Sequence, residues 1–169
     1  MRLKIITQEH LTFFILMIAS ASVITAWIAE YIFGLHPCTL CYYQRYEYMS
    51  IIALLSLQLF ILPHRFLKIS LTIVALIFLA TALTAAYQVA VENHWVTAPN
   101  ICKGSNEADS FEEFRETLMG KSATACDQVQ WALFGISMAG YNFILSLGLS
   151  FLCFFGIFKN EKKKKFARR

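Results

Sequence analysis

Four long apolar stretches follow one another along the chain, separated by shorter polar segments. They cover residues 11–33, 42–62, 69–91 and 133–158. A bilayer core is about 30 Å thick and takes roughly 20 helical residues to cross. Each stretch is long enough, so the pattern predicts an all-α integral membrane protein, a bundle of four transmembrane helices that makes residues 1–169 a single membrane domain.

Composition supports a membrane protein over a soluble domain, because 57% of the residues are hydrophobic and only 15% are charged. The first stretch could instead be a cleaved signal peptide, since Ala19-Ser20-Ala21 resembles a cleavage site. The apolar run continues to Phe33, however, well beyond a signal-peptide core of about 7–15 residues. We therefore expect the first helix to be retained.

The basic residues predict the orientation. Eleven of the 15 lysines and arginines lie before the first helix, between the second and third, or after the fourth. The positive-inside rule then places both termini in the cytoplasm and the segments 34–41 and 93–130 on the opposite face. The basic tail, 159–169, is interpreted as an anchor near anionic membrane lipid and not as a nucleic-acid site.

Four of the five cysteines fall on the non-cytoplasmic face. Cys38 and Cys41 lie in the short loop and the start of the second helix, and Cys102 and Cys126 lie in the long segment. Disulfides persist in oxidising compartments such as the bacterial periplasm. Cys153, inside the fourth apolar stretch, is expected to be a buried hydrophobic residue without a chemical role.

The C-x-x-C pair has a redox, a structural and a metal interpretation. A disulfide that closes so small a loop restrains the unfolded chain little, which favours a redox pair over a structural one. Zinc would need further ligands, and the non-cytoplasmic segments offer no second C-x-x-C. The candidates are only Cys102, Cys126, His36 and His94, so no metal is expected.

Cys41 is predicted to begin the second helix, where unpaired N–H groups and the helix dipole stabilise a thiolate. Arg45 follows four residues later and shares the helical face of Cys41. An arginine this close to hydrocarbon marks a functional site unless it reaches the interface or pairs with nearby Glu47.

The stretch "PCTLCYYQR" at 37–45 lies at the start of the second of four helices, and a second cysteine pair lies between the third and fourth. This combination resembles the DsbB family of disulfide-generating membrane proteins. The resemblance implies an oxidoreductase of the bacterial inner membrane. A periplasmic, DsbA-like thioredoxin-fold protein would reduce a Cys102–Cys126 disulfide through a mixed disulfide at Cys102. Cys126 would then exchange with Cys38, leaving Cys41 as a thiolate facing ubiquinone or menaquinone.

The same resemblance assigns two residues to the quinone. Arg45 matches the family's arginine and would stabilise the thiolate and the charge that develops on the quinone oxygen. His94, just past the third helix, falls near a position from which the family can approach the quinone.

Other functions remain open. A vitamin K epoxide reductase-like enzyme also combines a small helical bundle with a C-x-x-C, but the position of this motif at the second helix favours DsbB. A non-catalytic membrane scaffold with two structural disulfides is the simplest alternative. A channel is disfavoured, because the third and fourth apolar stretches contain no charged residue.

Two features of the long segment add expectations. Within 109–120, the spacing of Phe111, Phe114 and Leu118 predicts a short amphipathic helix, lying on the membrane surface or packed on the bundle. Residues 97–101, before Cys102, contain Pro99 and could dock on the partner as an extended strand.

Overall fold

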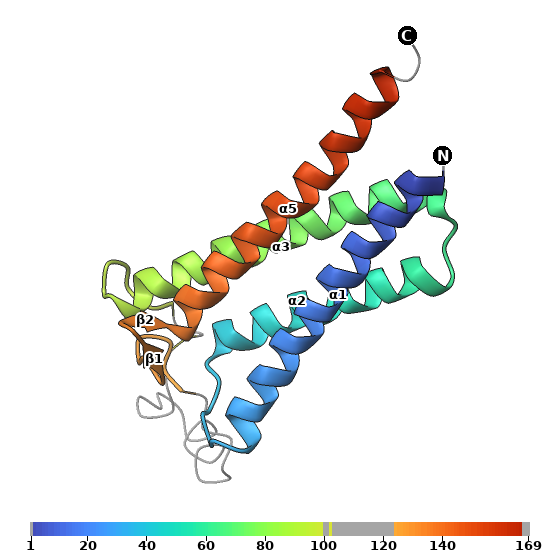
Figure 1. Cartoon of the computed structure of the whole chain (residues 1–169). Helices are drawn as coiled ribbons and strands as arrows, with labels where there is room; N and C mark the ends of the chain where they lie inside the picture. The colour runs from blue at the N-terminus through green and yellow to red at the C-terminus, as the bar shows by residue number, and fades with distance from the viewer. Residues whose placement is uncertain (1, 100–101, 103–123, 167–169) are drawn as a thin grey trace.

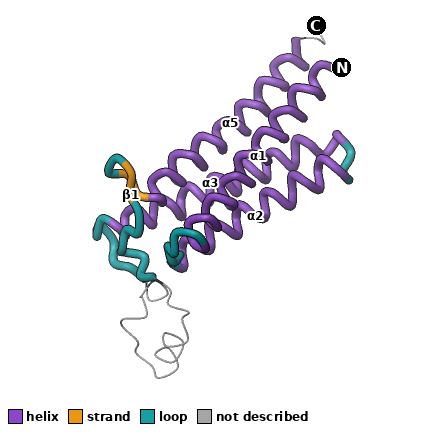
Figure 2. The backbone as a smooth tube through the Cα atoms, turned by 60° about the horizontal axis from the view of Figure 1, so that its bottom comes forward, coloured by secondary structure: helices purple, strands orange, loops and turns teal. Residues whose placement is uncertain are grey.

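The computed structural model describes residues 2–99, 102 and 124–166. In this part of the chain, four long helices lie alongside one another (Figures 1 and 2). They are α1 (Arg2–Tyr31), α2 (Thr39–Phe60), α3 (Leu67–Glu92) and α5 (Met138–Phe166). A 3-10 turn, η1 (His64–Phe66), joins α2 to α3, and a hairpin of β1 (Ala132–Leu133) and β2 (Ile136–Ser137) precedes α5. The mostly helical architecture with four long helices agrees with the prediction.

Three helical segments in the described residues are long and apolar enough to cross a membrane: Glu9–Tyr31, His64–Glu92 and Met138–Ile157. The remaining helix, α2, has 22 residues, which would span about 33 Å. It is less apolar because it carries Arg45, Glu47 and two glutamines. Its membrane crossing therefore stays a prediction.

The helices pack in an order that leaves one side of the bundle less closed. α3 packs most extensively on α5, α2 lies against both α1 and α3, and α1 meets α5 over a small area. The core contains Phe78, which is fully buried and forms an edge-on ring contact with Tyr48 at 5.7 Å between centroids. Cys153 is also fully buried in this core.

The start of the last helix differs from the prediction. The apolar run predicts a helix from 133, but 132–137 form the antiparallel hairpin, with Ala132 opposite Ser137. Its two turn residues, Phe134 and Gly135, have positive φ angles of 52° and 79°, which reverse the chain. The Ser137 hydroxyl then accepts the Gly140 N–H at 3.2 Å, so the helix is capped and begins at Met138.

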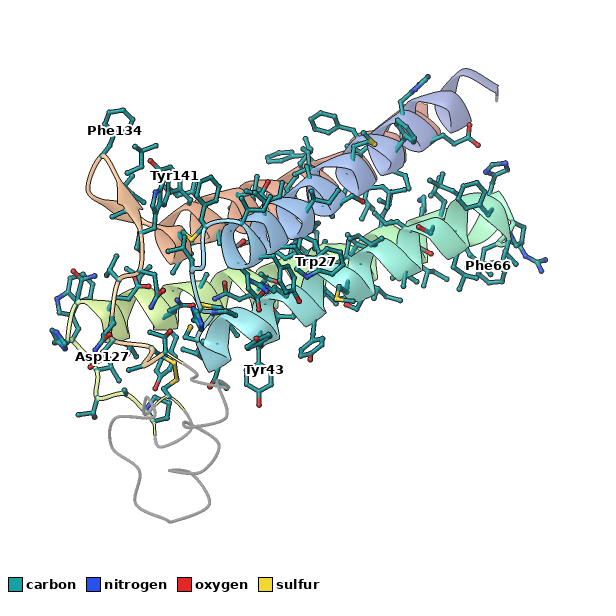
Figure 3. The ribbon with its side chains drawn as sticks, turned by 90° about the horizontal axis from the view of Figure 1, so that it is seen from below. Trp27, Tyr43, Phe66, Asp127, Phe134 and Tyr141 are labelled. Atoms are coloured by element: carbon teal, nitrogen blue, oxygen red, sulfur yellow. A yellow bond between two sulfur atoms is a disulfide. The ribbon has the colours of Figure 1, made fainter. Side chains whose placement is uncertain are left out.

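The two ends of the bundle differ in character. Both termini lie at one end, and the hairpin and the cysteine-containing loops lie at the other (Figure 1). Figure 3 shows the same separation, with Phe66 of the basic α2–α3 turn at one end and Asp127, next to Cys126, at the other. The fold thus gathers the candidate chemistry at the end opposite the termini.

Candidate active site

The C-x-x-C pair is held at the start of α2. Gly34, with φ at +68°, allows the chain to turn after α1, and Cys38 then occupies the N-cap of α2 in an extended conformation. Its sulfur accepts the Cys41 backbone N–H at 3.3 Å. Both thiols are free, and they sit where a helix N-terminus favours negative charge.

The two thiols of this pair differ in acidity. They precede the predicted span 42–62, Cys38 is buried, and Cys41 is half-buried. A hydrogen bond with the Cys38 side chain, helped by the Gln88 amide and the charge of Arg45, lowers the pKa of Cys41 to about 7. The same hydrogen bond, together with burial, raises the pKa of Cys38. Cys41 is therefore the more acidic thiol of the pair.

Arg45 pairs with a carboxylate of another helix. Its guanidinium forms an ion pair with Glu30 of α1 and donates to the Ala26 carbonyl at 3.1 Å. The sequence also allows an ion pair between Arg45 and Glu47, but this pair is not formed. Glu47 instead accepts a 3.5 Å hydrogen bond from Thr84 of α3. The Arg45 and Glu30 side chains are 15% and 19% exposed, so the pair is largely shielded from solvent.

The second cysteine pair is a disulfide. Cys102 and Cys126 are joined, with their Cα atoms 5.2 Å apart, and both are almost fully buried. Backbone hydrogen bonds hold the bridge, since Cys102 donates to the Pro99 carbonyl at 2.8 Å and Cys126 to the Cys102 carbonyl at 3.1 Å.

The fold brings the two pairs together. Cys38, Cys102 and Cys126 belong to one buried cluster, and Cys41 packs against it. Thr124 forms a parallel bridge with Cys38 and donates its hydroxyl to the His36 carbonyl at 2.9 Å. The segment that carries Cys126 therefore runs beside the C-x-x-C loop, as exchange between the pairs requires.

A large cavity opens beside Cys41. Its volume is about 970 Å³, and its walls come from all four long helices and from the segments before α2 and α5. Small and apolar residues of α1, such as Ala26 and Ala29, line one side. Most of the exposed wall is apolar, and the polar side chains that reach it include Cys41, Gln44, Arg45, Gln88 and Glu92. An apolar chamber with a small polar group on its wall is typical of a small-molecule site.

His94 lies away from this cavity. It adopts a positive φ of 57° just after α3 and borders a smaller cavity of about 210 Å³, together with Asp127 and Thr97. The structure thus brings Cys38, Cys41 and Arg45 to the large cavity but not His94.

Several site residues were not anticipated from the sequence. Glu30 is the partner of Arg45, while Gln88 and Asn142 belong to a hydrogen-bonded group that reaches Cys41. The available signal was that each is a polar residue within or at the end of an apolar stretch, where such residues default to functional roles. The sequence does not show which residue each would face.

Two expectations concern other parts of the chain. Among the described residues, no group of three or more His, Cys, Asp or Glu side chains could hold a metal ion. The predicted amphipathic helix within 109–120, like Asn100 and Ile101 of the proposed docking strand, lies outside the described residues.

The chain also resembles known proteins. A family model described as disulfide bond formation protein DsbB matches residues 8–156. The uncharacterized protein RP370 of Rickettsia prowazekii (strain Madrid E) is 30% identical over 136 residues, which cover 79% of this chain and 77% of that protein. No solved structure matches. With a free C-x-x-C beside a buried disulfide in a helical bundle, and with this match over most of its length, the chain belongs to the DsbB family.

Proposed function

We propose that the protein is a thiol:quinone oxidoreductase of the bacterial inner membrane. It reoxidises a DsbA-like thioredoxin-fold protein of the periplasm and passes the electrons through its two cysteine pairs to a membrane quinone. Family membership supports a disulfide-forming membrane oxidoreductase. The proposal adds the quinone, the partner and the roles of the individual cysteines.

The observation that carries the proposal is the position of Cys41. This low-pKa thiol lies on the wall of the large cavity, one helical turn before Arg45. The cavity suits a quinone, because its walls are mostly apolar and its polar side chains include hydrogen-bond donors for carbonyl oxygens. Arg45 and Gln44 would hold the polar ring, and the small residues of α1 would contact its apolar parts.

The cysteines supply a balanced reaction. Oxidation of the Cys38–Cys41 dithiol forms one S–S bond and releases two electrons and two protons, which a bound quinone would accept. The new disulfide is then reduced by the Cys102–Cys126 dithiol through attack of Cys126 on Cys38. The resulting Cys102–Cys126 disulfide, the outer pair, is reduced in turn by a dithiol of the partner through a mixed disulfide at Cys102. Cys38 and Cys41 are the inner pair. Each step transfers two electrons in the same direction.

The proposed orientation places both cysteine pairs in the periplasm and both termini in the cytoplasm. The basic residues near the termini and in the α2–α3 turn support it, and the structure brings these segments to one end of the bundle (Figure 1). Reporters fused to the C-terminus test it. A reporter that works only in the cytoplasm should be active, whereas activity of one that works only in the periplasm would reverse the orientation.

Quinone reduction tests the proposed activity. The purified protein is mixed with a reduced DsbA-like protein and a ubiquinone or menaquinone analogue, and quinone absorbance is followed. We expect turnover that Cys41→Ser abolishes, because the thiolate is lost. Arg45→Ala should slow turnover mainly by raising the apparent KM for quinone, by about tenfold or more, because a donor and a positive charge leave the cavity.

Cys153→Ser is the matched control, because Cys153 is buried in the core away from both pairs and should leave turnover intact. A scaffold with two structural disulfides predicts no quinone reduction with any such partner. Turnover that survives Cys41→Ser would remove Cys41 from the reaction.

A further inference from the structure

A chain of hydrogen-bonded polar side chains leads from Tyr48 of α2, through α5 and α3, to the sulfur of Cys41. The Tyr48 hydroxyl donates to Asn142 Oδ1 at 2.8 Å, and Asn142 Nδ2 donates to Gln44 Oε1 at 2.8 Å. Gln44 Nε2 donates to Gln88 Oε1 at 2.9 Å, and Gln88 Nε2 donates to Cys41 Sγ at 3.4 Å. The chain thus links α2, α3 and α5 and ends at a reacting atom.

All four hydrogen bonds point the same way, and Glu92 accounts for the direction. Gln88 Nε2 also donates to Glu92 Oε1 at 3.1 Å, so the amide nitrogen faces two acceptors, a carboxylate and a sulfur. The amide oxygen must then face Gln44, which presents its own nitrogen. The same reasoning turns the Asn142 nitrogen toward Gln44 and leaves the Asn142 oxygen to accept from Tyr48.

Burial makes this chain energetically significant. Tyr48, Gln44 and Gln88 are 4%, 7% and 5% exposed, so water competes little for their hydrogen bonds. In such surroundings, aligned hydrogen bonds polarise one another, and each donor strengthens the next. Turning one amide over would leave several buried groups facing like groups, which costs far more than breaking one exposed hydrogen bond.

We infer that Gln88 is a further residue of the active site, which stabilises the Cys41 thiolate by direct donation, and that Gln44, Asn142 and Tyr48 are positioning residues that hold the Gln88 amide in this orientation. The inference deepens the proposed function, because it concerns how the reactive thiolate is maintained. Its test, however, needs neither a quinone nor a partner protein.

The charged and titratable groups around Cys41 do not make this amide redundant. Cys38 donates to the same sulfur, Arg45 contributes positive charge, and the Glu92 carboxylate accepts from the same Gln88 nitrogen as the sulfur does. Glu30 pairs with Arg45 and offsets much of its charge. The outer cysteines are joined in a disulfide and do not titrate. Gln88 is a neutral donor that gives one amide hydrogen to the Cys41 sulfur and the other to the Glu92 carboxylate.

The test is the pH profile of Cys41 alkylation. The full-length protein is held with its inner pair reduced, and iodoacetamide labelling is assigned to Cys41 by peptide fragmentation. Gln88→Met should move the midpoint upward by about one pH unit, a roughly tenfold fall in rate at pH 6, because it removes the donor but keeps the volume. Tyr48→Phe should move it in the same direction by a smaller amount, because it removes only the first donor.

The double variant tests whether Tyr48 acts through Gln88. With Gln88→Met already present, adding Tyr48→Phe should produce no further shift. Gln58→Met is the matched control, since Gln58 is another buried amide of α2 and accepts from Ser70 at 2.7 Å, remote from Cys41. It should leave the midpoint in place whatever it does to thermal stability.

An unchanged midpoint in Gln88→Met would overturn the role of Gln88. A Tyr48→Phe shift that adds fully to that of Gln88→Met, or no shift from Tyr48→Phe alone, would overturn the positioning chain. These outcomes are independent of quinone reduction, so this inference can fail while the proposed function holds, and the reverse.

Discussion

At the scale of single residues, the charge of Arg45 is neutralised by Glu30, which lies on another helix, α1. Glu30 accepts from Arg45, and the Tyr42 hydroxyl donates to the same carboxylate at 3.4 Å. The guanidinium also lies 5.6 Å from the centre of the Tyr42 ring. An arginine in surroundings this apolar is costly unless it is paired, so Glu30 makes its presence beside the cavity tolerable.

Removing the charge of Arg45 or of Glu30 alone should therefore destabilise the protein more than removing both charges together. We expect Glu30→Gln to lower the free energy of unfolding by about 2 kcal/mol, and Arg45→Gln to have a similar effect. The double variant should recover at least half of the summed loss, because neither charge is left alone. Denaturation in detergent measures the cycle. Simple additivity of the two single losses would show that the pair contributes no coupling.

The acidity of Cys41 gives a second prediction at this scale. Its pKa of about 7, against an ordinary 9.0, predicts alkylation that is half-maximal near pH 7. Because the Cys38 side chain is the largest cause, Cys38→Ala should move the midpoint upward toward 9. The low folded pKa also stabilises the reduced protein, fully above about pH 9 and progressively less as the pH falls through 7. A midpoint that Cys38→Ala leaves near 7 would contradict this assignment.

Residues close in sequence were predictable, and partners across helices were not. The presence of Cys41 and Arg45 on one face of α2 follows from helical spacing, and the position of Cys41 near the start of α2 follows from the apolar pattern. The contacts of Glu30, Gln88 and Asn142 depend on how α1, α3 and α5 are rotated about their axes. Apolar stretches this uniform carry no strong periodicity to specify such rotations.

At the scale of elements, the β1–β2 hairpin shapes the approach to α5. The Tyr141 hydroxyl donates to the Leu133 carbonyl at 3.0 Å, and the Tyr141 ring lies 6.4 Å from that of Trp131. Phe134 at the tip is 91% exposed and points away from the bundle (Figure 3). Leu133 and Trp131 also line the large cavity, so the hairpin forms part of its wall.

The turn of this hairpin is sensitive to side-chain type. Both turn residues have positive φ, which glycine adopts freely and Phe134 adopts at a cost. Gly135→Ala should destabilise the hairpin by about 1 kcal/mol, and Phe134→Asn should stabilise it by a smaller amount, because asparagine tolerates this conformation. Hydrogen exchange of the hairpin amides should change in opposite directions in the two variants. The same direction of change in both would refute the turn geometry.

The hairpin also shows why one helix boundary was wrong. Residues 131–145 are almost all apolar, and a short apolar run does not distinguish a buried helix from a strand. The Phe-Gly turn lacks the Asn or Asp that usually marks a two-residue hairpin. The other three helices were predicted well as elements, because length and apolar character decide them. Among the described residues, however, α2 is the long helix without a segment apolar enough to count as a membrane span.

At the scale of the whole molecule, the fold places two thiol pairs and one cavity in series. The buried disulfide adjoins the C-x-x-C loop, and the C-x-x-C pair lines the cavity. This order matches the proposed direction of electron flow, from the outer pair to the inner pair and then into the cavity. A protein with two merely structural disulfides has no need of such an order.

Counting electrons in a single turnover tests this series most directly. The protein is reduced at Cys38, Cys41, Cys102 and Cys126, freed of reductant, and mixed with excess quinone in the absence of any partner. Each dithiol carries two electrons, so the wild type should reduce two quinones per chain. The Cys102→Ser/Cys126→Ser variant should reduce one, and Cys41→Ser none. One quinone per chain in the wild type would show that the outer pair is not connected to the inner pair, and none would refute the proposed reaction.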